Sequence, residues 1–406
     1  MLVSGQTDSD TWGPVTFTSG STAQWARTGG PNSGQVYCFA VSSTSLFTGT
    51  DGGGVFLSTD DGTSWSAVNT GLTNKRVKAL FIPPVSGGLF AGTLGGGILL
   101  STNNGTSWSG VSTGLTNSSV HAFAVSGVNL FAGTFGGGVF LSTNNGTSWT
   151  GINTGLTNTS VTALAVSGVN LYAATSTGGV FLSTNNGASW TAVNTGLTNP
   201  YVDDLAVSGT NLYAGTYDGV FLSTNNGTSW TQTSMKGTVV TSLAVSGANL
   251  FAGTTVGVHM STNNGTSWRE VNTGLTDTNV WSLAILGANL FAGTMYSGVW
   301  KRPLADMVTS VGEFSTYLPT QFSLDQNYPN PFNPLTCIQY SVSEASHVSL
   351  KVFNVLGEEI ATLAGENKAP GNYRVTWDAS GYPSGVYLYR LISAGRISTG
   401  RMTLLK

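Results

Sequence analysis

The segment LSTNNGTSW at residues 141–149 occurs six times along the chain with small changes, and each copy ends in a tryptophan. These tryptophans are Trp65, Trp108, Trp149, Trp190, Trp230 and Trp268. Successive copies are separated by 43, 41, 41, 40 and 38 residues, so the chain repeats one structural unit with a period near 40 residues. A unit of this length cannot bury its apolar face alone and must stack against its neighbours.

Each unit contains four short segments, apolar or alternating, that are bounded by Gly, Asn and Ser. In the fourth repeat they are VTALAVSG, NLYAAT, GGVFLSTNNG and ASWTAVNTG. This pattern is typical of strands joined by tight turns, and no segment has a helical period. We name the strands a, b, c and d in chain order. Four strands in about 40 residues predict the blade of a β-propeller, and hence an all-β fold.

The number of blades follows from the starts of strand a, each marked by a valine. These are Val36, Val77, Val120, Val161, Val202, Val240 and Val280. The seventh unit stops after strand c, whereas residues 23–29 (AQWARTG) carry a tryptophan without the preceding turn. We therefore expect a seven-bladed β-propeller over residues 23–305, with residues 23–29 supplying strand d of the last blade. Such closure removes exposed sheet edges.

The turn between strands c and d has a recurrent chemistry. Asn tolerates left-handed backbone angles, Gly adopts them freely, and the first Asn or Asp can accept backbone N–H bonds across the turn. The pattern Ser-x-Asp-x-Gly-x-Ser-Trp resembles the Asp-box of sialidase-like and sortilin-like propellers. STDDGTSW at 58–65 matches fully, with Asp60 at the acidic position. The other five turns carry Asn103, Asn144, Asn185, Asn225 and Asn263. Because Asn has fewer acceptor sites, we expect these turns to be somewhat weaker. The resemblance implies a stapled hairpin, with a tryptophan packed between blades, and not a catalytic site.

Variation among the repeats is concentrated on one face of the expected propeller. The a–b and c–d turns hardly vary, whereas the b–c and d–a loops do, and the second residue of strand a varies most. These second residues, expected to surround the channel mouth, are Tyr37, Lys78, His121, Thr162, Asp203, Thr241 and Trp281. Either the residues on this face vary because the fold does not constrain them, or the face binds a ligand. Aromatic rings beside sparse polar groups suit sugars or peptides. The candidate ligand contacts are Tyr37, Lys78, His121, Asp203, Tyr217 and Trp281.

Catalysis is not expected. A glycosidase usually needs two carboxylates about 5–10 Å apart, yet residues 66–202 contain no Asp or Glu. The acidic candidates on the variable face are Asp51, Asp203, Asp204, Asp218 and Asp277. Sialidases bind their substrate with clustered arginines, but Arg27, Arg76, Arg269 and Arg302 are scattered along this sequence. We find no nucleophile–base arrangement, metal cluster or phosphate loop, and expect no cofactor.

Composition limits the partners further. Charged residues make up 8% of the chain and the formal net charge is -3, so no strong field attracts nucleic acid. The sequence has no run of about 18 apolar residues, so we expect no membrane span. Of the two cysteines, Cys38 stands where other repeats carry alanine, which favours a small core residue, and Cys337 lies far from it.

The repeats cease near residue 305, and a second domain follows a linker over residues 306–321. Alternating segments such as HVSLKVFNV and GVYLYRLIS predict a small Ig-like β-sandwich over residues 322–406. NYPNPFNP, VFNVLGEEIATL, WDASGYPSGVYLYRL and MTLLK together resemble the C-terminal sorting domain of type IX secretion substrates. The resemblance implies that the type IX machinery is a partner of residues 322–406, and that the protein is secreted or held on the outer-membrane surface.

The N-terminal extension, residues 1–22, has neither the basic nor the apolar region of a signal peptide. Substrates of this kind also need an N-terminal Sec signal, which we expect to lie upstream of this chain or to have been removed. The sequence thus favours an exported, non-catalytic binding module for an extracellular glycan or protein. The alternatives are a structural subunit of an extracellular matrix or filament, and a divergent glycoside hydrolase.

Overall fold

The computed structural model describes residues 24–308 and 322–405, apart from residues 32–33, 43, 85–87 and 328–329. The expected extension over residues 1–22 and most of the expected linker lie outside this part of the chain. The chain divides into two compact units, Met1–Thr309 and Ser310–Lys406.

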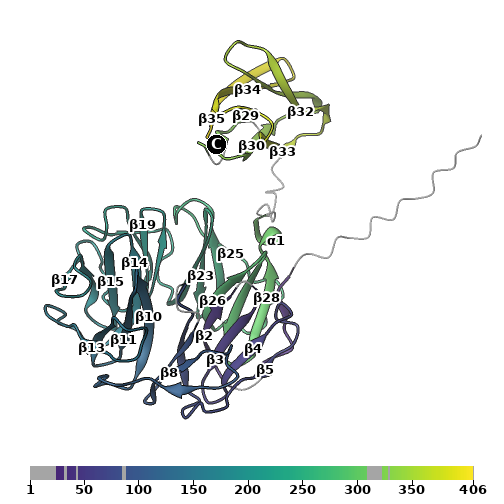
Figure 1. Cartoon of the computed structure of the whole chain (residues 1–406). Coiled ribbons are helices and arrows are strands. Elements are labelled where there is room, and N and C mark those ends of the chain that lie inside the picture. The colour runs from purple at the N-terminus through teal and green to yellow at the C-terminus, as the bar shows by residue number, and fades with distance from the viewer. Residues whose placement is uncertain are drawn as a thin grey trace, which may run out of the picture. The chain divides into compact units, whose positions relative to one another are not determined.

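The first unit contains seven four-stranded antiparallel sheets (Figure 1). The strands in position a are β2 (Val36–Val41), β6 (Val77–Phe81), β10 (Val120–Ser126), β14 (Val161–Ser167), β18 (Val202–Ser208), β22 (Val240–Ser246) and β26 (Val280–Leu286). Those in position b are β3 (Leu46–Thr50), β7 (Leu89–Thr93), β11 (Asn129–Thr134), β15 (Asn170–Thr175), β19 (Asn211–Thr216), β23 (Asn249–Thr254) and β27 (Asn289–Thr294).

The two outer positions of each sheet complete the blade. Position c holds β4 (Gly54–Ser58), β8 (Gly97–Ser101), β12 (Gly138–Ser142), β16 (Gly179–Ser183), β20 (Gly219–Ser223), β24 (Gly257–Ser261) and β28 (Val299–Pro303). Position d holds β5 (Ser66–Ala67), β9 (Ser109–Gly110), β13 (Thr150–Gly151), β17 (Thr191–Ala192), β21 (Thr231–Gln232), β25 (Arg269–Glu270) and β1 (Ala26–Arg27).

The seven innermost strands form a closed ring. Each contacts the next in chain order, and β26 contacts β2. Every predicted start of strand a is the first residue of one of these strands. The predicted seven-bladed propeller is therefore confirmed.

The seventh sheet is completed by the N-terminal strand β1. Ala26 pairs with Lys301 and Arg27 pairs with Trp300 of β28. Trp25, which is 2% exposed, donates its backbone N–H to the Thr273 carbonyl at 2.8 Å. The first and last parts of the propeller sequence thus share one sheet, the arrangement expected for residues 23–29.

Equivalent side chains in the second strand of every blade build the framework. An aromatic ring at most 1% exposed fills each interface, and these residues are Phe47, Phe90, Phe131, Tyr172, Tyr213, Phe251 and Phe291. A buried threonine ends each strand and donates its hydroxyl, at 2.8–3.0 Å, to the carbonyl of a glycine, which is the first residue of strand c or, in the seventh blade, the residue before it. These threonines are Thr50, Thr93, Thr134, Thr175, Thr216, Thr254 and Thr294. The repeated satisfaction of a buried polar group fixes the same hairpin seven times.

The c–d turns keep one hydrogen-bond pattern whether they carry Asp or Asn. Asp60 accepts the N–H of Ser64 at 2.8 Å and its hydroxyl at 2.6 Å. Asn103 accepts the Ser107 N–H at 2.9 Å but donates its own amide to the Ser107 hydroxyl, also at 2.9 Å. The amide donor replaces the missing acceptor, so the Asn turn retains both contacts. The residue that follows lies in the left-handed region in all six turns, with φ between 54° and 58°.

The first unit ends in a short helix that the sequence did not predict. Residues Leu304–Val308 form α1, although a linker was expected from residue 306. Met307 is fully buried in the same core cluster as Trp25, and its carbonyl accepts a hydrogen bond from Arg269. This packing, which involves residues distant in sequence, accounts for the difference.

The second unit consists of two antiparallel sheets. One contains β29 (Ser323–Leu324), β30 (Leu335–Val342) and β33 (Gly371–Asp378). The other contains β32 (Glu359–Lys368), β31 (Ser346–Phe353), β34 (Gly385–Ser393) and β35 (Arg396–Leu404). Ile338 and Tyr340 of the first sheet share one buried cluster with Val348 and Leu350 of the second. This is the core of the predicted sandwich.

Candidate ligand-binding site

The seven variable second residues of strand a lie out of register in their sheets. In every innermost strand the pairing shifts between the first and the third residue. Such a bulge leaves the second residue outside the ladder and re-aims its side chain. All seven line a single cavity of about 570 Å³, and they are Tyr37, Lys78, His121, Thr162, Asp203, Thr241 and Trp281.

Two stacked aromatic pairs stand where the b–c and d–a loops meet this cavity. His121 stacks on Phe135 with ring centroids 5.1 Å apart, and Tyr201 stacks on Tyr217 at 5.3 Å. Phe135, Tyr201 and Tyr217 are 46%, 45% and 49% exposed, and all three line the cavity. Tyr217 was among the predicted contacts, but Tyr201 was not. In the sequence, the only indication of a role for Tyr201 was its position in a variable d–a loop.

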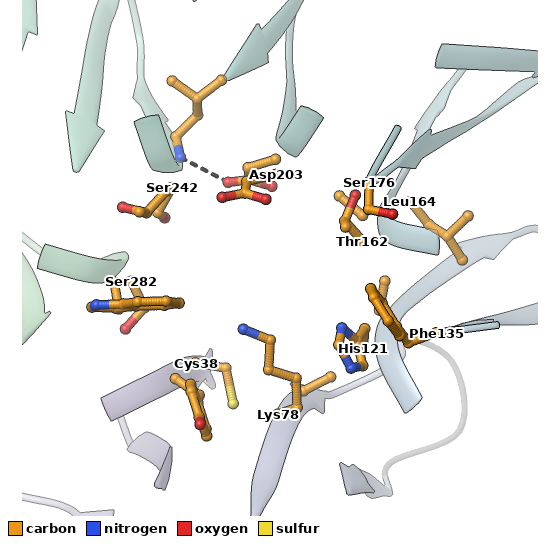
Figure 2. A pocket seen from close by; sticks show the side chains of 18 of the residues that line it. Cys38, Lys78, His121, Phe135, Thr162, Leu164, Ser176, Asp203, Ser242 and Ser282 are labelled. Atoms are coloured by element: carbon orange, nitrogen blue, oxygen red, sulfur yellow. Dashed lines mark hydrogen bonds between the residues drawn. The ribbon is translucent and has the colours of Figure 1, made fainter. Parts of the chain in front are cut away.

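Lys78 brings a positive charge into the cavity between two aromatic side chains. Its Nζ lies 4.6 Å from the Tyr37 ring centroid and 5.4 Å from that of Trp281. Figure 2 shows the side chain pointing into the open space across from Asp203. No described carboxylate lies within ion-pair distance of Lys78. Burial lowers the pKa of Lys78, the direction expected for a desolvated cation.

Two neighbouring carboxyl groups on β18 differ in their surroundings. Asp204 accepts the backbone N–H groups of Leu205 at 2.8 Å and Leu243 at 2.7 Å, one on each oxygen. Burial raises the pKa of Asp204 to about 7. Burial also raises the pKa of Asp203, to about 6, although the Lys78 charge opposes this shift. Asp203 therefore presents the freer carboxyl group to the cavity.

His121 is neutral at physiological pH. Burial lowers the pKa of its imidazole to about 4, and the nearby positive charge of Lys78 acts in the same direction. Its Nε2 lies 3.3 Å from the Ser119 hydroxyl. The ring therefore presents a stacking surface and a neutral hydrogen-bonding edge.

The remaining acidic candidates do not reach the cavity. Asp51 forms an ion pair with Arg76 at 2.8 Å. Asp218 accepts the Gly237 N–H and Asp277 accepts the Tyr296 N–H, each at 2.8 Å. Of the five candidates only Asp203 and Asp204 line the cavity.

The arginines of the propeller serve the framework. Arg27 donates to the Ser297 carbonyl, and Arg302 donates to that of Val271. No arginine lines the described cavity, so the arrangement differs from the arginine cluster of sialidases. Within the described ranges no three His, Cys, Asp or Glu side chains gather as a metal would require, and no helix there is long and apolar enough to cross a membrane.

The C-terminal unit can be compared directly with a known family. A family model described as a secretion system C-terminal sorting domain matches residues 326–404. This unit is a type IX sorting domain. The sorting domain directs export by type IX secretion to the cell surface or the extracellular space, which confirms the predicted location.

Solved structures share the fold of the propeller at low identity. PorZ, a surface component of the type IX secretion system of Porphyromonas gingivalis, is 16% identical, with a TM-score of 0.58 over 93% of this chain and 60% of its own. YCF48 bound to D1 peptide is 13% identical, with a TM-score of 0.56 over 70% and 97%. A GH74 enzyme of Niastella koreensis is 19% identical, with a TM-score of 0.51 over 67% and 43%. The chain thus spans 60% of the length of the PorZ chain that it matches, which is less than two thirds. No curated protein matches the chain significantly.

Proposed function

We propose that the exported propeller binds an extracellular glycan or protein at this cavity without transforming it chemically. The observation that carries the proposal is the set of side chains that the seven variable positions bring to one cavity. The framework repeats almost unchanged, whereas these positions place two aromatic rings, a lysine, a histidine and an aspartate together. The ring would bring these positions together whatever their residues, so the support comes from the chemistry that they combine in one concave site.

The exposed aromatic pairs support binding over mere tolerance of change. Phe135, Tyr201 and Tyr217 each leave nearly half of their surface in solvent at the cavity. An exposed aromatic cluster beside a few polar groups is typical of a recognition surface. Sugar rings and peptide side chains both stack on such platforms.

The acidic residues support a non-catalytic role. A glycosidase places two carboxyl groups on either side of the bond that it cleaves. Here Asp203 and Asp204 are adjacent in one strand, and both oxygens of Asp204 accept backbone N–H groups. This leaves a single available carboxyl group in the cavity.

Binding is tested by probing the purified full chain against a glycan array and against immobilised extracellular proteins. Trp281→Ala and Tyr217→Ala should weaken binding at least tenfold. Tyr296→Ala is the matched control, because Tyr296 is 77% exposed but does not line the cavity. Melting curves establish that each variant is folded.

Three results would contradict the proposal. Equal binding by all three variants would show that the cavity is not the binding site. Ordered self-assembly without any ligand would favour the matrix subunit. Turnover of a bound glycan that is lost in Asp203→Asn would make the protein an enzyme.

A further inference from the structure

The cavity has one cationic side chain, Lys78, and no described carboxylate forms an ion pair with it. Resting on the proposed binding function, we infer that the cavity recognises an acidic sugar, a hexuronate, whose carboxylate binds Lys78 and whose hydroxyl groups face the opposite wall. Three features of the cavity lead to this assignment.

The first feature is the state of Lys78. Its ammonium group has no hydrogen-bond or ion-pair partner among the described residues, and the groups closest to its charge are the rings of Tyr37 and Trp281. A desolvated cation is costly unless an anion or hydrogen-bond acceptors satisfy it. Since the side chain points into open space in Figure 2, a ligand anion can reach Nζ directly. Because the rings of Tyr37 and Trp281 flank the ammonium group, a ligand can approach it from the open cavity.

The second feature is the chemistry of the wall across from Lys78. The Thr162 hydroxyl donates to the Val202 carbonyl at 2.5 Å, and the Thr241 hydroxyl donates to the Val280 carbonyl at 2.6 Å. Because each hydroxyl hydrogen is already used, its oxygen is left as an acceptor. Asp203 adds a carboxyl group to the same cavity. This wall therefore suits the hydroxyl donors of a sugar.

The third feature is the balance of charge. Lys78 is the only basic side chain that lines the described cavity, and it shares the cavity with Asp203 and Asp204. Either anion would face these two carboxyl groups, but a doubly charged phosphate would bring two negative charges to one ammonium, whereas a carboxylate brings one. A neutral sugar could offer Lys78 hydroxyl acceptors but no opposite charge. A hexuronate has both the carboxylate and the hydroxyl donors, and the Tyr201–Tyr217 pair offers a stacking platform for a neighbouring sugar ring.

The test is isothermal titration calorimetry of the full chain with trimers of galacturonate, glucuronate and mannuronate. The fully methyl-esterified trimers serve as neutral partners that differ from the acids only by one methyl group on each carboxyl group. We expect at least one acidic trimer to bind at least tenfold more tightly than its ester. Lys78→Met should abolish this preference and Lys78→Arg should keep most of it. Lys75→Met is the control, because it removes the same charge from an exposed loop position that does not line the cavity.

Each other outcome has a distinct meaning. Equal affinity for acid and ester, or an unchanged preference in Lys78→Met, overturns the hexuronate assignment while cavity binding itself stands. A Lys78-dependent preference for peptides with a free C-terminal carboxylate over their amides, with no response to uronates, also overturns it in favour of a protein partner. If no sugar or peptide binds, the proposed function fails as well.

Discussion

The ring nitrogen of each repeat tryptophan ties its blade to the one before it. The Nε1 atoms of Trp108, Trp149, Trp190 and Trp230 donate to backbone carbonyls of the preceding unit at 2.7–2.9 Å. Trp25 makes the equivalent bond to Val271 at 2.6 Å. A phenylalanine would fill much of the same volume but could not make this contact, so the repeat requires an indole.

The value of that hydrogen bond can be measured at Trp190. Trp190→Phe should lower the free energy of unfolding by about 1–2 kcal/mol, and Trp190→Ala by about 3–5 kcal/mol. The control is Trp300→Phe, which changes the same volume at a buried site where the indole nitrogen has no partner. Urea unfolding should show the smaller loss in the control. Equal losses at both sites would mean that packing alone, and not the hydrogen bond of the indole, explains the loss of stability in Trp190→Phe.

The raised pKa of Asp204 predicts a stability that depends on pH. The folded state holds the proton up to about pH 7, whereas an unfolded aspartate releases it near its ordinary value of 3.8. The stabilising contribution of Asp204 is therefore complete below pH 4 and is lost as the pH rises through 7. We expect the melting temperature of the wild type, relative to Asp204→Ser, to fall between pH 5 and pH 8.

Serine suits this comparison because Ser242 occupies the equivalent position in the next blade, and its hydroxyl accepts the Leu283 N–H. The variant retains Asp203, Lys78 and His121, so their titrations cancel in the difference to first order. His121 itself acts in the opposite sense below pH 6.5, since its folded-state pKa is lowered. A difference that does not change with pH would show that Asp204 is ionised in the folded protein throughout this range.

At the scale of elements, the two-residue strand β1 decides whether the ring is closed. Without it, β28 would expose the edge of the seventh sheet, and unpaired edges promote aggregation. Trp25 also fills the core between the sixth and seventh blades, where it contacts the cluster that contains Met307.

Removing residues 1–30 should therefore lower the melting temperature by 10 °C or more, or cause aggregation on concentration. Removal of residues 1–22 is the control, because it keeps the paired residues Ala26 and Arg27. Differential scanning calorimetry measures the melting temperature of the two truncated proteins, and light scattering measures their aggregation. If both truncated proteins melt like the full chain, β1 does not hold the ring together.

Most of the propeller could be predicted because its interactions are local and repeated. The valine that starts strand a, the Asn-Gly turn and the tryptophan occur in nearly every unit, and the lone Trp25 indicated the closing strand. Helix α1 could not be predicted, since Met307 is fixed by distant residues. Tyr201 was missed for a similar reason, because only the folded ring brings it against Tyr217.

At the scale of the whole molecule, the two units have separate cores. The buried cluster of the sorting domain contains only residues from Phe322 onward, and each described cluster of the propeller contains only residues up to Met307. The described residues of each core come from one unit alone, so we expect a core substitution in one unit to leave the core packing of the other unchanged.

Because the sorting domain directs export, removal of residues 322–406 should abolish export. Expressed behind a Sec signal in a bacterium with type IX secretion, the full chain should reach the surface or medium, and the truncated chain should stay inside. The Trp281→Ala variant is the control, since it alters the cavity alone. Immunoblots of cell fractions measure the distribution, and secretion of the truncated chain would contradict the prediction.

The bulge at the start of each innermost strand separates the residues that line the cavity from the framework that carries them. Because seven side chains stand outside the ladders, each can be exchanged without disturbing a single strand-pairing bond. Duplication of a blade copies the architecture, and one codon per copy then resets the chemistry offered to the solvent. A library randomised at these seven codons would vary the lining of the cavity while the propeller framework stays the same.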